Sequence, residues 1–274
     1  MSSSLTDLDI SEITILLSPE RLATFLKLTG SNRNAIELHQ ETLRLNSSLM
    51  TVIASVEIAL RNCVCENLTA YFGNTSWITK PTAPFQWRKM ENRLVAKALQ
   101  SARRAEYSKL SQAQKAELDN SAFPKGRPAN LSHTARSIAR TQQIQVSDGK
   151  IIAETTLYFW KRLYSADYEH SLWRTTLKKT FPNKKLTRAD IANNLEAIYQ
   201  ARNRLAHHEP VLHSRLNETL QAVSFISENL GVNQPSKEAP LARLVAPDLA
   251  IVKEKAEALH KRFAAYRVDN QSSL

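Results

Sequence analysis

The feature that most constrains the fold of this chain is a helical pattern of apolar residues between about residues 34 and 72. Apolar side chains recur there at steps of three and four residues, and Gly73 follows the last of them. This period places them on one face of a helix, because a half-buried strand would alternate instead. The sequence therefore predicts one long helix whose apolar face consists of Leu49, Ile53, Val56, Leu60, Val64, Leu68 and Phe72.

The other segments favour helices as well. Glycine is scarce, with 5 residues in 274, and short alternating runs are few, so no sheet is expected. Ser18 and Pro19 predict a helix start, Gly30 its end, and Leu22, Phe25 and Leu26 its apolar face. We expect an all-α fold whose further helices cover about residues 87–110, 187–207, 216–230 and 248–267.

The expected domain organisation is one helical domain in residues 1–232, followed by a polar linker and a C-terminal helix in residues 233–274. A basic helix and loop at about 88–147 form an insertion, with Leu94, Ala98 and Ala102 turned inward and residues 111–147 less regular. The last helix carries a narrow apolar seam that fits a partner helix, in this chain or another. The seam consists of Val252, Ala256, Leu259, Phe263 and Tyr266.

Between these segments, two apolar patterns predict two buried helices. The first runs through Ile152, Leu157, Phe159, Trp160 and Leu163, and the second through Leu172, Trp173, Leu177 and Phe181. Their helical spacing is what packing requires, whereas aromatic platforms for single-stranded RNA must be exposed. We expect these Trp and Phe side chains in the core.

The net charge of +11 is concentrated in two segments. Residues 88–141 hold 12 Lys and Arg against 4 Asp and Glu, and residues 160–188 hold 8 against 2. A localised positive charge suits a polyanion, of which nucleic acid is the commonest, although a merely basic surface gives the same count. The candidate RNA contacts are Arg88, Lys89, Arg93, Lys97, Arg103, Arg104, Lys125 and Arg127.

Cysteine use and the N-terminal residues favour a cytoplasmic protein. Cys63 and Cys65 lie two positions apart in a predicted helix, point to different sides and cannot form a disulfide there, which fits a reducing compartment. The first ten residues contain neither the basic segment nor the apolar segment of a signal peptide, so no signal peptide is expected. We found no apolar run long enough to span a bilayer and expect no membrane partner.

Polar residues cluster at the end of the helix predicted at 187–207. The segment 201–210 reads ARNRLAHHEP, with two arginines, an amide and two imidazoles. The apolar stripe of this helix runs through Ile191, Leu195, Ile198 and Leu205, and Arg202 falls on the same stripe. A guanidinium there needs a partner. The candidates are an acid such as Glu57 and a bound phosphate.

Helix geometry limits how this cluster acts. Asn203 and His207 are four apart and share a face, as do Arg204 and His208 on the adjacent face. Arg202 and His207 are five apart, about 140° around a regular helix. They reach one atom only if the helix end tightens near Pro210, or if a two-fold dimer brings two copies of the motif together.

Four stretches resemble a known family. Arg202-Asn203-x-x-x-His207 matches the R-x4-6-H signature of the HEPN superfamily of ribonucleases, and RNRLAHHEPV resembles the C-terminal motif of Abi-like (abortive infection) proteins. The run Glu57-Ile58-Ala59-Leu60-Arg61-Asn62 is similar to that family's first motif, and the resemblance covers roughly residues 35–230. Thr156-Leu157-Tyr158 departs from it, because a small residue is expected before Phe159. The other similar stretches are 71–73 with Trp77, 156–160, and 172–173 with Phe181-Pro182.

The resemblance implies a HEPN-like helical bundle, a homodimer and metal-independent RNA cleavage to a 2′,3′-cyclic phosphate. In that picture His207 activates the ribose 2′-OH or protonates the leaving oxygen, and Arg202 stabilises the charge on the phosphate. The expected partners are RNA, a second copy of the chain, and an antitoxin or a phage-derived trigger; no cofactor is expected. The supporting residues are Asn203, Arg204, His208, Glu57, Arg61 and Asn62.

Other interpretations stay open at this point. His207, His208, Glu209 and His213 resemble metal ligands, but structural zinc sites usually add cysteine, and we expect no metal. Imidazoles near a helix C-terminus also favour the helix dipole. The protein could instead bind RNA or a partner without cutting, or be an oligomeric helical protein that uses the seam of its last helix.

Overall fold

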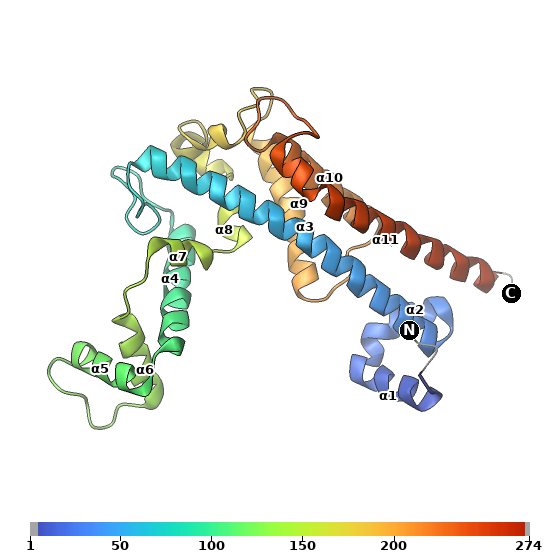
Figure 1. The fold of residues 1–274 in the computed structure, drawn as a ribbon, viewed down its shortest axis with the longest axis horizontal. Helices are drawn as coiled ribbons and strands as arrows, with labels where there is room; N and C mark the ends of the chain where they lie inside the picture. The colour runs from blue at the N-terminus through green and yellow to red at the C-terminus, as the bar shows by residue number, and fades with distance from the viewer. Residues whose placement is uncertain (1–4, 272–274) are drawn as a thin grey trace. The chain divides into compact units, whose positions relative to one another are not determined.

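The structure, a computed structural model, describes residues 5–271, with side chains up to residue 266. The described part is helical and contains no strand, which confirms the all-α prediction. The chain divides into two compact units (Figure 1). Unit 1 comprises Met1–Leu60 and Phe181–Leu274, and unit 2 comprises Arg61–Thr180, which includes the basic segment expected at 88–147.

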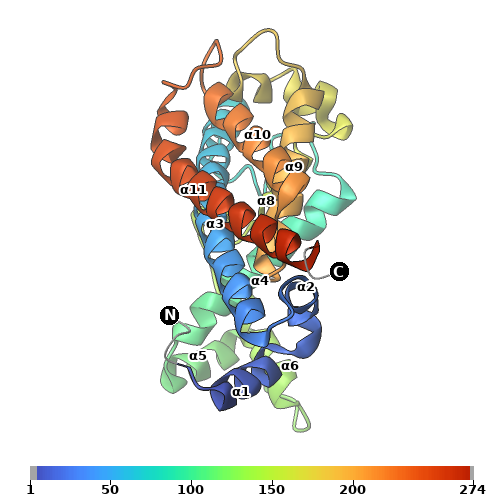
Figure 2. The same cartoon turned by 90° about the vertical axis from the view of Figure 1, so that its right-hand side faces the viewer.

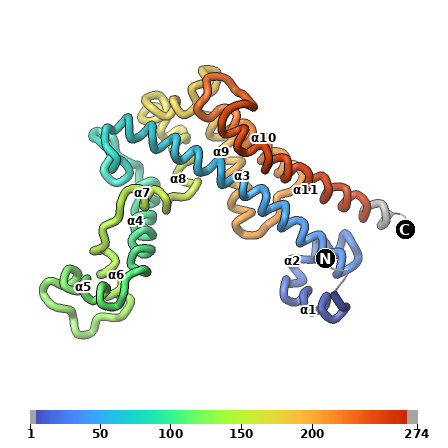
Figure 3. The backbone as a smooth tube through the Cα atoms, viewed as in Figure 1, coloured from blue at the N-terminus to red at the C-terminus, as the bar shows by residue number. Residues whose placement is uncertain are grey.

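Helix α3 (Asn32–Phe72) is the long helix that the apolar pattern predicted. Every residue of the predicted stripe is buried, and the backbone N–H of Gly73, with φ 67°, ends the helix on the carbonyl of Thr69. The backbone tube shows it as one continuous helix (Figure 3). Its residues 32–60 belong to unit 1 and its residues 61–72 to unit 2.

By length and composition, α3 is also long and apolar enough to cross a membrane. The sequence analysis found no such run, because polar residues interrupt the apolar ones along the chain. The core helix of a soluble protein passes the same test, and the apolar stripe of α3 is buried against protein. This finding is therefore weak evidence for a membrane span.

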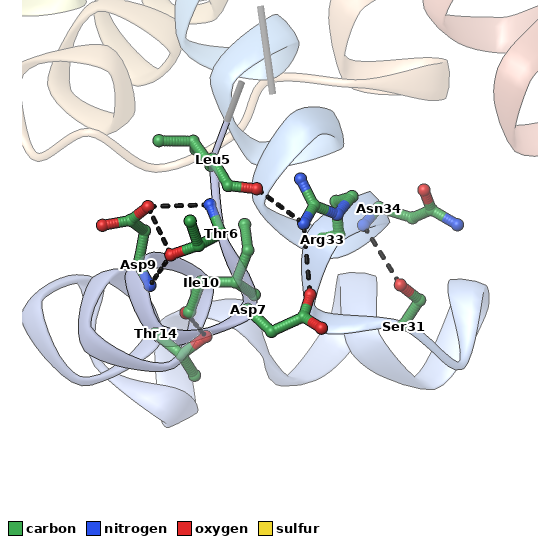
Figure 4. Close-up of polar contacts among 9 residues, drawn as sticks. All are labelled: Leu5, Thr6, Asp7, Asp9, Ile10, Thr14, Ser31, Arg33 and Asn34. Atoms are coloured by element: carbon green, nitrogen blue, oxygen red, sulfur yellow. Dashed lines mark hydrogen bonds and ion pairs between the residues drawn. The ribbon is translucent and has the colours of Figure 1, made fainter. Parts of the chain in front are cut away.

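Two short helices, α1 (Asp7–Leu17) and α2 (Pro19–Thr29), precede α3 in unit 1. Thr6 and Asp9 cap α1, and Arg33 at the start of α3 donates to the carbonyl of Leu5 (2.9 Å) and contacts Asp7 (Figure 4). As predicted, Ser18 caps α2, Pro19 is its first residue, and Gly30 ends it in the left-handed conformation. Leu26 is exposed, so its assignment to the apolar face was wrong.

The rest of unit 1 is built from α9 (Arg188–Ala206), α10 (His213–Asn229) and α11 (Pro240–Gln271). Helix α9 packs on α10, and α11 packs on α10 and α2 (Figures 1 and 2). Helix α11 also runs antiparallel to α3, because its Lys255 contacts Ser48 (2.7 Å) and its Arg262 contacts Glu37 (3.0 Å) and Glu41. Its apolar seam thus meets helices of its own chain.

Helix α11 begins eight residues earlier than expected, at Pro240 rather than 248. Pro247 lies inside the helix, where it supplies no backbone N–H, and the helix expected from the sequence began one residue after it. The buried residues Leu241, Ala242 and Val245 hold the preceding turns in the helix against the rest of unit 1. Tertiary packing therefore overrides the local signal of the proline.

Unit 2 contains α4 (Lys89–Lys109), α5 (Gln112–Ala122), α6 (His133–Gln142), α7 (Asp148–Ala153) and α8 (Leu157–Arg162). The basic helix was predicted correctly, but its buried side includes Val95 where Leu94 was expected. Residues 111–147 are more regular than expected, since two helices of 11 and 10 residues flank the loop at 124–128. Ser111 and Ser132 cap these helices.

The two buried helices expected in the middle of the chain are broken into shorter pieces. Helices α7 and α8 replace the first. Three short helical segments replace the second: the 3₁₀ turns η2 (Ala166–Tyr168) and η4 (Leu177–Thr180), and the π-helical η3 (Glu169–Trp173) between them. The apolar spacing was right, since Phe159, Trp160 and Trp173 are buried as predicted. It could not distinguish one helix from successive turns.

Unit 2 also holds a charged network in its core. Glu91 of α4 is fully buried, and its carboxylate accepts from Arg162 Nε (2.8 Å) and from the hydroxyl of Tyr168 (2.8 Å). Burial raises the pKa of Tyr168, so the phenol stays protonated and donates. Arg162 also pairs with Asp167 (2.9 Å).

The two cysteines are unpaired and half-buried in the unit 2 part of α3. Burial raises the pKa of the Cys63 thiol, and it raises that of Cys65 to about 11. Both thiols are therefore protonated at neutral pH, and neither has the thiolate character of a nucleophilic cysteine.

A candidate active site at the end of helix α9

Helix α9 positions the arginine–histidine motif. Its first turn is closed by a capping box, in which Thr187 and Asp190 each accept from the other's backbone N–H. Its apolar stripe is buried and consists of Ile191, Leu195, Ile198, Ala201 and Leu205. The expectation that Arg202 occupies this stripe was wrong, because the step after Ile198 is three residues and falls on Ala201. Arg202 lies beside the stripe and is half-buried.

The last turn of α9 tightens, as the convergence of Arg202 and His207 requires. His207 N–H donates to the carbonyl of Arg204 (3.1 Å) as well as to that of Asn203 (3.2 Å). His208 N–H then bonds to Leu205 and Glu209 N–H to Arg204 (2.8 Å), which is the Schellman arrangement at a helix C-terminus. His208 has φ 57°, at the position that glycine usually fills.

Side chains from two other helices fix this turn from outside. Arg21 of α2 donates from Nη1 to the carbonyl of His208 (3.2 Å), and Asn46 of α3 donates from Nδ2 to the carbonyl of Glu209 (3.1 Å). Within the turn, Arg204 pairs with Glu209 (3.0 Å). A left-handed residue outside glycine costs free energy and persists only where its surroundings hold it. The turn that carries both histidines is held in this way.

The predicted catalytic pair lies at this helix end, with Arg202 in the last turns of α9 and His207 directly after its last residue. The Arg202 guanidinium forms no ion pair or side-chain hydrogen bond with any residue in the described part of the chain. His207 is the C-cap residue of α9, and its side chain is exposed. A half-buried cation without an acid differs from the structural pairs elsewhere in the chain, and it is available to an anionic ligand.

The predicted supporting residues are divided between the units. Asn203, Arg204 and His208 accompany the motif in unit 1, where Arg204 serves the turn through Glu209. Glu57 is half-buried in the unit 1 part of α3. Arg61 and Asn62 belong to unit 2, where Arg61 Nε donates to Asn62 Oδ1 (3.4 Å).

The predicted RNA contacts all lie in unit 2, and four of them line one groove of about 640 Å³ between α4 and α6. We call it the basic groove; from α4 it is lined by Arg93, Lys97, Arg103 and Arg104. Lys89, Lys125 and Arg127 are exposed outside the groove. Arg88 pairs with Asp167 (3.3 Å), and Arg103 donates to the carbonyl of Ile144 (3.1 Å), so these two side chains also have structural partners.

The sequence analysis missed a second feature of unit 1, a pocket of about 800 Å³ beside the turn of α9. We call it the histidine pocket, because His39, His208 and His213 all line it, together with Arg21 and Phe263. His39 lies in α3, ahead of the apolar stripe that the sequence predicted. Its polar ring within the long helix was the available signal, as was Asn46 about two turns further on.

Among the described residues, no group of three or more His, Cys, Asp or Glu side chains is arranged to hold a metal ion. Comparison of the chain with protein-family models, with curated proteins and with solved structures finds no match. The function proposed below therefore rests on the residues themselves and on the resemblance of their motifs.

Proposed function

We propose that this protein is a metal-independent endoribonuclease of the abortive-infection or toxin type, acting in the cytoplasm. The observation that carries the proposal is the end of α9: a half-buried Arg202 that has no acidic partner among the described residues, and an exposed His207 on a turn that other helices fix. The resemblance of the motifs to Abi-like HEPN proteins supports the same chemistry.

In the proposed reaction, His207 takes the proton of a ribose 2′-OH, and the oxygen attacks the adjacent phosphorus. The bond from phosphorus to the 5′-oxygen breaks, the leaving oxygen receives a proton, and the other product ends in a 2′,3′-cyclic phosphate. Arg202 stabilises the negative charge that develops on the phosphate oxygens, and Asn203 positions the imidazole or the phosphate. A single imidazole cannot be base and acid at once, so a second His207 from a two-fold dimer would protonate the leaving oxygen.

The test is cleavage of total cellular RNA in the presence of EDTA by the wild type, Arg202→Ala and His207→Ala. We expect both variants to lose cleavage while their circular dichroism and thermal unfolding match the wild type. Arg243→Ala is the matched control, because Arg243 is an exposed arginine of unit 1 outside the motif. Mapping the RNA ends should show 2′,3′-cyclic phosphates, and full activity in either motif variant contradicts the assigned roles.

A second candidate function is RNA binding without cleavage, which the basic groove favours because it gathers four cations on one face of unit 2. In that case binding would be tight and sensitive to salt, and no substrate would be cut. Replacing Arg93 and Lys97 together should then reduce the dependence of affinity on salt, while Arg202→Ala should change nothing. An antitoxin or a phage-derived trigger remains a proposed partner in either case.

A further inference from the structure

The residues with left-handed backbone, glycines aside, lie at the histidine pocket in the described chain. In the described part of the chain, three residues other than glycine have a positive φ: Ser18 (72°), His208 (57°) and His213 (53°). All three line this one pocket. Strained backbone of this kind is concentrated at ligand-binding and catalytic sites, where the surrounding structure maintains it.

A buried polar side chain without a partner lies in the same pocket wall. His39 of α3 is 5% exposed, and neither of its ring nitrogens has a hydrogen-bond partner. Burial and then the charge of Arg21 lower its pKa, so the ring is neutral at neutral pH, with one donor and one acceptor. A buried polar group left unsatisfied is rare in folded proteins and is explained by a ligand or water that completes it.

The hydrogen-bond donors around the pocket suit an anion. Its two acids are already engaged within the protein, Glu20 with the hydroxyl of Ser18 and Glu209 with Arg204. Arg21 spends one N–H on the carbonyl of His208, and Lys27 is exposed. Helix α10, of 17 residues, begins at His213 without a side-chain cap and without an acid in its first turn, and such an N-terminus attracts negative charge.

The remaining wall of the pocket is apolar, so the uncharged part of the ligand is expected to be apolar as well. Phe25 of α2 and Phe263 of α11 lie nearly parallel, with ring centroids 6.5 Å apart, and Leu28, Leu43 and Leu212 complete the surface. The volume of about 800 Å³ suits a small organic molecule. From these observations we propose that the histidine pocket binds a small organic acid, a carboxylate on an aromatic body, which His39 and Arg21 contact at its charged end.

This site is distinct from the proposed cleavage of RNA, and its binding can be measured without RNA. It nevertheless shares Arg21 and His208 with the turn that carries the motif. A carboxylate on the free N–H groups of Arg21 leaves its bond to the His208 carbonyl in place. Occupancy is therefore expected to stabilise the turn, and the ligand would act as a regulator of whatever the motif does.

The experiment uses naphthalene-2-carboxylate as the probe and its neutral carboxamide as the control, titrated by calorimetry into the full-length protein. We expect the carboxylate to bind at least about tenfold more tightly, since a charge-assisted hydrogen bond contributes that much. Arg21→Gln and Lys27→Gln should each reduce this preference, and Arg243→Gln should leave it unchanged. Equal binding of carboxylate and carboxamide by the wild type, or no binding of either, overturns the proposal.

His39→Phe separates a ligand contact from a structural histidine. Phenylalanine has a similar volume and no unsatisfied nitrogen, so we expect this variant to melt at a higher temperature and to bind the carboxylate less tightly. Unchanged affinity overturns the assignment of His39. Tighter binding of adenosine monophosphate than of the carboxylate overturns the ligand class and would assign the pocket to nucleotides.

Discussion

The arginines in the ion pairs of unit 2 and Arg202 at the end of α9 are the same residue type and differ in what surrounds them. Arg162 reaches the fully buried Glu91 and also Asp167, and Arg136 and Arg140 share Asp119. At the end of α9, Arg202 is half-buried and meets no acid within the described residues. The first group of cations stabilises the fold, and the second is free to meet an anion from outside.

The difference shows why a net charge of +11 is a poor guide to RNA contacts. An arginine that neutralises a buried carboxylate already donates its hydrogen bonds within the protein. Removing its partner leaves an unpaired charge in the core. The partial burial of an arginine without a partner is not offset by an ion pair, and its N–H groups stay available to a bound anion. The contrast makes opposite predictions for stability and for activity.

The largest expected effect on stability comes from breaking the buried network. Glu91→Ala leaves Arg162 and the Tyr168 hydroxyl without their buried partner, and it should lower the free energy of unfolding by about 3 kcal/mol. Urea denaturation followed by circular dichroism measures this loss. Glu257→Ala is the control, because Glu257 pairs with Lys261 on the exposed face of α11 and its loss should change the free energy of unfolding far less. Similar losses in the two variants would remove the distinction between the two groups of arginines.

The next effect is a loss of activity with little change in stability. Arg202→Ala should lower the rate of RNA cleavage about 100-fold, the usual loss when one donor to a developing negative charge is removed. Its free energy of unfolding should change by less than about 0.5 kcal/mol. Single-turnover cleavage and urea denaturation are measured on the same protein samples.

Arg162→Ala is the matched variant for this comparison. It should unfold more easily than the wild type, because it leaves Glu91 as an unpaired buried carboxylate. The protein that remains folded should cleave RNA at the wild-type rate. Should Arg202→Ala prove as unstable as Arg162→Ala, Arg202 would belong with the structural arginines.

A smaller effect concerns the strained turn. His208→Gly should raise the free energy of unfolding by about 1 kcal/mol, because glycine adopts the left-handed conformation without the steric cost that a side chain incurs. His207→Gly is a stringent control, since the neighbouring histidine has φ −95° and gains nothing from glycine. Thermal unfolding of the two variants should therefore shift in opposite directions. A destabilised His208→Gly would mean that the imidazole itself supports the turn.

These residues also mark how far the sequence predicts the structure. Local signals were sufficient where one segment determines its own conformation: the capping box of Thr187 and Asp190, the Ser18-Pro19 start of α2, and the long stripe of α3. They failed where distant segments decide, as when packing continues α11 through Pro247 or buries Glu91 beside Arg162. Periodicity also could not separate Ala201 from Arg202, since helical steps of three and four are equally allowed.

The candidate site follows the same division. The motif residues were found because they are close together in sequence. The helix end is tightened, which is one of the two routes that the sequence left open for Arg202 and His207. Arg21, His39 and Asn46 were missed, because their roles depend on contacts across as many as 187 positions of sequence. Only the folded chain shows that the turn is held by α2 and α3.

The smallest expected effect is a pH dependence at the third structural acid, Asp119, which holds Arg136 and Arg140 of α6 on α5. Hydrogen bonds from Arg140 and Arg136 lower the pKa of its carboxyl well below the usual value. A lowered pKa in the folded state means that the stabilisation is fully present above the unfolded value of about 3.9 and is lost as the pH falls toward the folded value. The difference in melting temperature between the wild type and Asp119→Asn should thus be constant from about pH 8 to pH 5 and shrink below about pH 4. Because this carboxyl is nearer the surface than Glu91, added salt should also reduce the difference, and a difference that grows in acid would contradict the pairing.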